Sequence, residues 1–404
     1  MTNSQTTNMN QIVSWASRAV SWVDQNAPED TSNLGQLRRL RRRSRRLHDA
    51  AGKPTSVAVF GASQAGKSYL VSSLARPRDG RMLLRYGQRE FDFLKEINPQ
   101  GGTESTGVVT RFTTAPPVPM HVDGSQPPDR QATVPVRLLS AADIVRVLMN
   151  SFMLDFPENN LDTWPVEDPE KLRTDIHGLA KSGERVANGF SRDDAEELQE
   201  YCQLQFSKKP YAEPLAKGYW VWLAENIEFL PFPSLIEALS PLWGRIDPFT
   251  KMAERFLTSL AQIGHASLAF CTPEAFSSAE NGRDDSIVNV STLFRMGSPQ
   301  SDADLIDIVT ESGLKTQLPR TIVTALIAEL IAPIVTVPWP FLNTTDLLDF
   351  PGARTRGGMV TIPHLIAHPP AHMGEFILRG NVAHLFARYQ VNMEISAMLL
   401  CVGD

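Results

Sequence analysis

Eight residues near the start of the chain have the spacing of a phosphate-binding loop. They are Gly61-Ala-Ser-Gln-Ala-Gly-Lys67-Ser68, which match the pattern GxxxxGK[ST] in full. In such a loop the backbone N–H groups turn toward phosphate oxygens, and the following helix adds the positive end of its dipole. We predict that Lys67 reaches the β- and γ-phosphates of a nucleotide and that the Ser68 hydroxyl binds Mg²⁺. The residues predicted to contact the nucleotide are Gly61, Ala62, Ser63, Gln64, Ala65, Gly66, Lys67, Ser68, Tyr69 and, from a later segment, Gly352.

A second segment, Thr345-Asp-Leu-Leu-Asp349-Phe-Pro-Gly352, supplies a carboxylate and a glycine. Asp349 ends an apolar run, so we expect it at the end of a strand, near Mg²⁺. Gly352 would place a backbone N–H near the γ-phosphate. The alternative is a simple β-turn, because Pro-Gly marks turns in general. Beside a complete phosphate-binding loop we favour the functional interpretation.

A third segment, from Gln100 to Phe112, is a threonine-rich loop that runs into a strand. Thr103, Thr106 and Thr110 could each bring a hydroxyl to Mg²⁺ and an N–H to the γ-phosphate. Chemistry alone leaves the choice among the three open, and a solvated turn is the alternative for all of them.

The pattern of apolar residues predicts the elements that position these segments. We expect strands over 56–60, 108–113, 132–139 and 342–350, a buried strand over 395–402, and a buried helix followed by a strand over 322–337. We expect helices over 66–74, 191 onward with Ser191 as N-cap, 233–243, 249–263 and 375–389. Apolar strands alternating with helices favour an α/β fold, a P-loop NTPase with a mainly parallel sheet flanked by helices.

The same pattern divides the chain into four parts. Residues 1–50 form a helical N-terminal arm, whose basic helix covers 34–50 after a loop at 26–33 with Ser32 or Asn33 as N-cap. Residues 51–140 form the first half of the NTPase core, 141–335 a mostly helical insertion, and 336–404 the second half of the core.

Composition excludes several classes of protein. The 404 residues are 42 % hydrophobic and 21 % charged, which is typical of a globular chain. The net charge of −6 argues against a nucleic-acid binder. We find no apolar run of about 18 residues and no signal peptide, and we therefore expect a cytoplasmic protein without a transmembrane segment. Association with a membrane and export without a conventional signal peptide stay open.

The stretch Leu37–Leu47 contains seven arginines and no acidic residue. As a helix it places Leu37, Leu40 and Leu47 on one side and arginines elsewhere. We expect this face to bind a protein partner, and anionic lipid is the alternative. The lack of interleaved aromatic residues argues against nucleic acid.

Two other groups of residues receive a structural interpretation. His364, His368 and His372 have a spacing that would align zinc ligands on a helix, but Pro369 and Pro370 break the helix. We therefore favour surface histidines. Trp220, Trp222 and Trp243 are interpreted as core residues of the insertion.

The segments GASQAGKS, STGVVTRF and LLDFPG together resemble the nucleotide-binding core of the dynamin superfamily of large GTPases. The resemblance singles out Thr110 as the threonine that binds Mg²⁺, beside Ser68 and Asp349. It implies Mg²⁺·GTP as the ligand and hydrolysis that involves Lys67, Gln64 and Thr110. It also implies that the basic N-terminal helix packs with helices outside the given sequence. With the basic N-terminal helix and the long insertion, the whole chain resembles the bacterial virulence factors of the SrfC type.

The sequence departs from the dynamin pattern in the position of a glutamine and in the long segment between Thr110 and Asp349, where a compact GTPase has a short hairpin. Dynamins carry a glutamine where Ser63 stands, and Gln64 comes one position later. The sequence also stops before the motif that reads the guanine base, so GTP is expected while ATP stays open. Two hypotheses follow. One is a GTP hydrolase, and the other is a nucleotide-binding scaffold subunit of a multicomponent virulence or toxin complex, with little or no hydrolysis.

Overall fold

A computed structural model describes most of the chain. The described residues are 3–27, 29–62, 65–78, 80–98, 106–119, 131–156, 168–179, 183–216, 218–277, 283–352 and 360–402. Ser63, Gln64 and Thr103 lie outside them, so their predicted roles are not tested by the fold.

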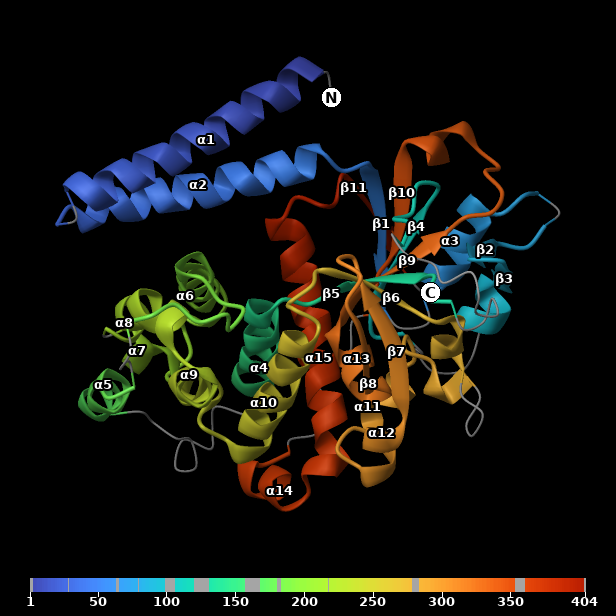
Figure 1. Cartoon of the computed structure of the whole chain (residues 1–404). Coiled ribbons are helices and arrows are strands. Elements are labelled where there is room, and N and C mark those ends of the chain that lie inside the picture. The colour runs from blue at the N-terminus through green and yellow to red at the C-terminus, as the bar shows by residue number, and fades with distance from the viewer. Residues whose placement is uncertain are drawn as a thin grey trace.

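Figure 1 shows how the helices and strands of the chain are arranged. The helices are α1 (Asn3–Asn26), α2 (Thr31–Ala51), α3 (Lys67–Ala75), α4 (Ala141–Asp155), α5 (Pro169–His177), α6 (Arg192–Phe206), α7 (Ala212–Leu215), α8 (Tyr219–Asn226), α9 (Phe232–Leu239), α10 (Asp247–Gln262), α11 (Val290–Phe294), α12 (Pro299–Ala303), α13 (Arg320–Leu326), α14 (Ile362–Ala367) and α15 (Pro369–Val391). The strands are β1 (Thr55–Gly61), β2 (Leu83–Tyr86), β3 (Arg89–Asp92), β4 (Val109–Thr113), β5 (Val134–Leu138), β6 (Leu268–Cys271), β7 (Leu305–Thr310), β8 (Lys315–Pro319), β9 (Ile327–Pro333), β10 (Thr345–Asp349) and β11 (Ala397–Cys401).

Nine strands of the described residues form one sheet, in the order β11-β1-β10-β4-β9-β5-β6-β7-β8. Strand β1 pairs in parallel with β10 on one side and with β11 on the other. Strand β4 pairs with the other edge of β10, antiparallel, and places Thr110 opposite Asp349. The carboxyl ends of β1, β10 and β11 therefore meet at one edge of the sheet, where the chain continues from Gly61 and from Asp349.

The expectation of a mainly parallel sheet is wrong for a large part of it. The nine strands form a mixed sheet, parallel at β11-β1-β10 and between β4 and β9 and antiparallel at the other pairings. Part of the reason lies in the segment 141–335, which was expected to be mostly helical, and the antiparallel pairing of β4 with β10 adds to it. Besides its helices this segment supplies β6, β7, β8 and β9 to the same sheet, and the hairpin of β7 and β8 makes that end antiparallel.

Different helices cover the two faces of the sheet around β1. Helix α3 packs against β1 and β10. Helix α15 lies against the opposite face, where its Phe386 ring is 5.3 Å from the ring of Phe60 and its Tyr389 ring is 4.9 Å from that of Phe350. Helix α15 in turn packs closely on α4 (Figure 1). The close approach is possible because Gly380 has no side chain, and a Cβ there would stand 2.2 Å from the Ser151 hydroxyl oxygen.

The N-terminal arm is a hairpin of two helices, as the sequence predicts. Helices α1 and α2 pack along each other and cross above the rest of the molecule (Figure 1). The predicted N-cap of α2 is wrong by two or three residues. Asp30 is the N-cap, and its carboxylate accepts a hydrogen bond from the Asn33 backbone at 3.3 Å.

Several further predictions are confirmed. Ser191 caps α6 in a capping box with Asp194. Trp220, Trp222 and Trp243 are buried. The strand over 395–402 is present as β11, but it is not buried. It lies at the edge of the described sheet, and the side chain of Leu400 is 71 % exposed.

Candidate functional site

The connection between β1 and α3, which we call the β1–α3 loop (residues 61–67), is shaped by two glycines. Gly61 lies beside β11 so closely that a Cβ there would stand 2.5 Å from the Cys401 carbonyl oxygen. Gly66 adopts a left-handed conformation with φ +79°, which side chains disfavour, and it directly precedes the first residue of α3. Since Gly66 has no side chain, none caps the N-terminus of α3 from that position.

Lys67 is the first residue of α3 and is only 5 % exposed. Its ammonium group donates a hydrogen bond to the Ala62 carbonyl oxygen at 2.7 Å, so the side chain folds back across the β1–α3 loop. A buried lysine at a helix N-terminus places two sources of positive potential at one spot. Anionic groups such as phosphates are stabilised in such a position.

Ser68 and Asp349 are brought together although they lie far apart in the sequence. The Ser68 hydroxyl donates a hydrogen bond to the Asp349 carboxylate at 2.5 Å. Thr110 stands opposite Asp349 in the antiparallel pair of β4 and β10, which puts both side chains on the same face of the sheet. Of the three residues predicted to hold Mg²⁺, Asp349 thus lies beside both others, hydrogen-bonded to Ser68 and paired across the sheet with Thr110.

The oxygen donors of this cluster suit Mg²⁺. One carboxylate and two hydroxyls are hard oxygen ligands, and Mg²⁺ in nucleotide sites commonly takes few protein ligands and completes its shell with phosphates and water. Both of the β-strand residues are buried, since Asp349 is 5 % exposed and Thr110 is 2 % exposed.

The other predicted residues lie nearby with different exposures. Ala62 and Ala65 belong to the β1–α3 loop, Tyr69 is 51 % exposed on α3, and Gly352 follows β10 by three residues. Thr106 bridges to Asn289 rather than to the β1–α3 loop. Of the two threonines that the structure describes, Thr110 is the one paired with Asp349, in line with the family resemblance.

Asn98 is a residue of this site that the sequence analysis missed. Its side-chain amide donates a hydrogen bond to the Ser68 hydroxyl at 2.9 Å. It directly follows a single π-helical turn, Phe93–Ile97, which precedes the threonine-rich loop. Nothing in the local pattern distinguishes Asn98 from other asparagines in loops, and the π-turn has no recognisable sequence signature.

A buried polar network next to Thr110 fastens β4 to its neighbours. The guanidinium of Arg111 lies 2.9 Å from the Glu329 carboxylate of β9 and 3.0 Å from Asp346 of β10. Burial raises the pKa of Glu329, but the charge of Arg111 outweighs it and holds that pKa below its ordinary value. Tyr389 of α15 donates a hydrogen bond to the same Glu329. The network thereby holds the strands that carry Thr110 and Asp349 in register.

The three histidines approach one another without forming a metal centre. The rings of His368 and His372 each lie 5.0 Å from that of His364, at the corner between α14 and α15. Pro369 and Pro370 begin α15, so they separate the two helices as predicted. Within the described ranges, no group of three or more His, Cys, Asp or Glu has the arrangement to hold a metal ion.

The arginine-rich stretch has a partner within the chain, which corrects our expectation of an outside partner, missing helices or lipid for this face. Six of its seven arginines form ion pairs with acidic residues of α6. These are Arg38 with Glu196 at 3.5 Å, Arg39 with Glu200 at 3.0 Å, Arg41 with Asp193 at 2.6 Å, Arg42 with Glu200 at 2.7 Å, Arg45 with Asp193 at 3.2 Å and Arg46 with Glu197 at 2.6 Å.

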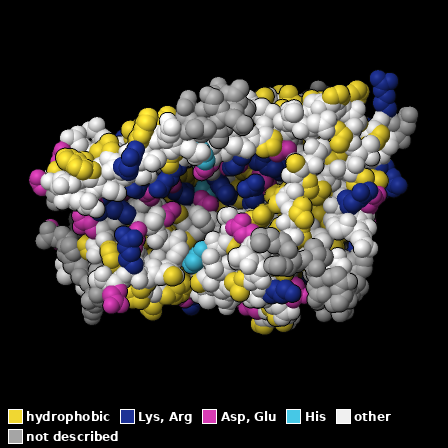
Figure 2. Space-filling view, turned by 45° about the horizontal axis from the view of Figure 1, so that its top comes forward, with side chains coloured by type: hydrophobic (Ala, Val, Ile, Leu, Met, Phe, Trp, Pro, Cys, Tyr) yellow, Lys and Arg dark blue, Asp and Glu magenta, His cyan; other side chains and the backbone are white. Residues whose placement is uncertain are grey.

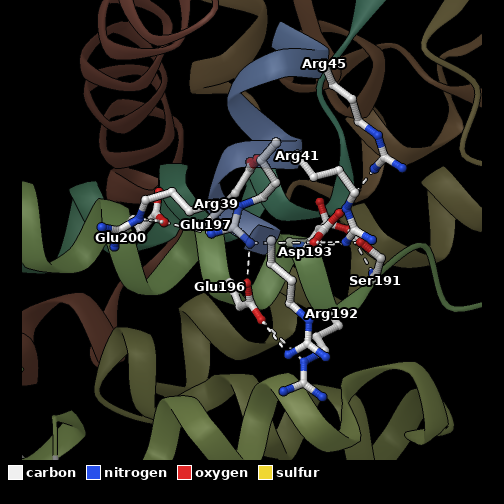
Figure 3. Close-up of polar contacts among 12 residues, drawn as sticks. Arg39, Arg41, Arg45, Ser191, Arg192, Asp193, Glu196, Glu197 and Glu200 are labelled. Atoms are coloured by element: carbon white, nitrogen blue, oxygen red, sulfur yellow. Dashed lines mark hydrogen bonds and ion pairs between the residues drawn. The ribbon is translucent and has the colours of Figure 1, made fainter. Parts of the chain in front are cut away.

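Figure 3 shows arginines of α2 pointing toward the carboxylates of α6, and we call this set of ion pairs the α2–α6 cluster. On the face drawn in Figure 2, Lys and Arg side chains gather with Asp and Glu in a hollow across its middle. The local charge pattern could not predict this partner, because the acidic residues of α6 lie about 150 positions later in the chain. The basic face of α2 is thus engaged by the protein itself.

A comparison with protein families shows which family the chain belongs to. The family described as "Putative bacterial virulence factor" matches residues 13–404. The chain belongs to this family. Its description names neither a ligand nor a reaction, and no curated protein matches the chain. Among the helices of the described residues, none combines the length and apolarity that crossing a membrane requires.

Proposed function

We propose that this member of the virulence-factor family binds a nucleoside triphosphate with Mg²⁺ at the β1–α3 loop. The observation that carries the proposal is the hydrogen bond between Ser68 and Asp349. It joins the last residue of a GxxxxGK[ST] match to a carboxylate at the end of a neighbouring parallel strand, and this juxtaposition is what binding of a metal–phosphate group requires.

The residues of the site would have two roles, binding of the phosphates and binding of the cation. Lys67 and the backbone N–H groups of the β1–α3 loop would bind the phosphates, while Ser68, Thr110 and Asp349 would hold the cation. When bound, Mg²⁺ would neutralise charge on the β- and γ-phosphates. The dynamin resemblance favours GTP, with ATP as the alternative, and hydrolysis by positioning and charge neutralisation. The same resemblance assigns Gln64 to the transition state.

The second candidate is a nucleotide-binding scaffold with little or no turnover, and one observation favours it. Thr110 lies inside β4, which is flanked by β10 and β9. Its backbone groups belong to the sheet, so the Thr110 side chain alone is available to a ligand. A γ-phosphate would then lack the N–H group that we expected from this threonine.

Binding of a fluorescent GTP analogue tests the proposal. We expect Lys67→Ala to weaken binding by roughly 10- to 150-fold, because a charge-assisted hydrogen bond contributes about 1.5–3 kcal/mol. Lys251→Ala is the matched control, since Lys251 is an exposed lysine of α10 paired with Asp247. Equal affinity of the wild-type protein and Lys67→Ala would refute the proposal.

Competition by unlabelled GTP and ATP then measures the preference for the base. Release of phosphate over many turnovers separates the two candidates. A hydrolase releases many equivalents of phosphate per protein, whereas a scaffold binds nucleotide and releases about one equivalent or less.

A further inference from the structure

Asn98 is fixed in place by both its backbone and its side chain. Its backbone N–H donates to the Phe93 carbonyl oxygen at 2.7 Å, which closes the π-helical turn, and the residue is only 9 % exposed. Its side-chain amide points to Ser68, with 2.9 Å between Nδ2 and Oγ. A π-turn is rare and is frequently found at functional sites. The contact that Asn98 makes directly after the turn is therefore a candidate for a functional role.

The hydrogen bonds of Ser68 define the direction of its hydroxyl group. A serine hydroxyl has one hydrogen to donate and two lone pairs that accept. The hydrogen is donated to Asp349, and Asn98 donates to one lone pair. Two of the three positions around Oγ are thereby occupied within the described protein, and the direction of the third is determined.

We propose that Asn98 is a positioning residue for the divalent cation, which it serves by holding the Ser68 hydroxyl so that the remaining lone pair faces the metal. The inference rests on the proposed function, because it concerns the same site. Asn98 acts through Ser68 and not through the phosphates, since its amide contacts the hydroxyl that would bind the cation. Its contribution therefore concerns the affinity for Mg²⁺ rather than the affinity of the loop for nucleotide.

The expected effect follows from the loss of one neutral hydrogen bond. Without the amide, the Ser68 hydroxyl keeps its bond to Asp349, but both of its lone pairs are then open, and the one that faces the metal is no longer selected. The Mg²⁺ concentration at half-saturation is expected to rise about 3- to 10-fold, the range that one such hydrogen bond supports. The affinity for nucleotide in EDTA is expected to stay unchanged.

The experiment measures binding of a fluorescent GTP analogue as a function of Mg²⁺ concentration, with a parallel titration in EDTA. It compares the wild-type protein with Asn98→Ala and with Asn98→Leu, which has a similar branched shape, with bulkier methyl groups, but no donor. Asn226→Ala is the matched control, because the Asn226 amide donates a hydrogen bond of 2.8 Å within α8, away from the site. Unchanged nucleotide affinity in EDTA shows that each variant is folded at the loop.

The outcomes separate this inference from the proposed function. A 3- to 10-fold rise in the Mg²⁺ requirement of both Asn98 variants, absent in Asn226→Ala, supports it. An unchanged Mg²⁺ requirement overturns the inference and leaves nucleotide binding intact. An equal loss of affinity in EDTA and in Mg²⁺ also overturns it, because Asn98 would then only support the loop. Absence of nucleotide binding by the wild-type protein overturns both.

Discussion

Replacement of Arg42 by methionine probes the α2–α6 cluster where it is most deeply buried. The Arg42 side chain is 5 % exposed and pairs with both Glu196 and Glu200, whose side chains are 16 % and 31 % exposed. Burial lowers the pKa of Arg42, but the neighbouring carboxylates outweigh it and raise that pKa above its ordinary value. The guanidinium is thus charged and stabilised by its surroundings at every relevant pH.

The magnitude follows from the exposure of the partners. Breaking a fully buried ion pair costs about 3–5 kcal/mol, and an exposed pair contributes about 0–1 kcal/mol. The cost of Arg42→Met lies between these limits, because Glu196 retains Arg38 and Glu200 retains Arg39 after the change. We expect a loss of about 2–3 kcal/mol from the free energy that holds the α1–α2 hairpin against α6.

Arg39→Met is the matched control. Arg39 lies on the same helix and pairs with Glu200 as well, but its side chain is 55 % exposed. The same chemical change there is expected to cost less than about 1 kcal/mol. The comparison therefore separates burial of the charge from removal of the charge.

Hydrogen exchange of the α1 and α2 amides is the assay, because opening of the hairpin is a local event that global unfolding can hide. A loss of 2–3 kcal/mol corresponds to exchange that is roughly 30- to 150-fold faster. Moderate salt is expected to accelerate exchange in the wild-type hairpin only slightly, since salt screens buried ion pairs less than exposed ones. Equal acceleration by Arg42→Met and Arg39→Met would refute the argument from burial.

Two further predictions concern the fold around the site and the acid side of the stability curve. Gly61→Ala is expected to lower the free energy of unfolding by about 2–3 kcal/mol in a urea titration, because the new Cβ meets the Cys401 carbonyl oxygen at 2.5 Å. Gly35→Ala is the control, since Gly35 lies in α2 with open space around it, and this change is expected to raise the free energy of unfolding by up to about 1 kcal/mol. Burial raises the pKa of Glu200, but hydrogen bonds from Arg42 outweigh it and lower that pKa. The resulting stability is present above the unfolded value of about 4.3 and is lost as the pH falls through the folded pKa. The difference in unfolding free energy between the wild-type protein and Glu200→Gln should therefore shrink below about pH 4, and a constant difference would contradict it.

Much of the candidate site could be predicted because its parts are short local patterns. The strands that end at Gly61 and Asp349 are apolar runs followed by glycine or a turn, and the loop between β1 and α3 carries its own spacing rule. The sequence also indicated that Asp349 and Ser68 belong to one site. It contained no local information about the pairing order that places β10 between β1 and β4.

The features that escaped prediction depend on contacts between distant residues. Arg42 and Glu196 are charged residues without a period that relates them, so only the fold shows that they meet. Asn98 acquires its role from the turn before it. The alternation in Leu305–Thr310 is typical of a half-buried strand, but it lies within a segment dominated by helical patterns.

The pairing of β1 has a consequence for the order in which the protein folds during synthesis. Both neighbours of β1 are made long after it, since β10 begins at Thr345 and β11 at Ala397. At ~5–20 residues per second, a ribosome needs about 15–60 s to reach β10 after completing β1. Throughout that interval the apolar strand β1 has neither of its neighbouring strands to pair with. A nascent chain that stalls between β1 and β10 therefore exposes a segment that chaperones would have to protect.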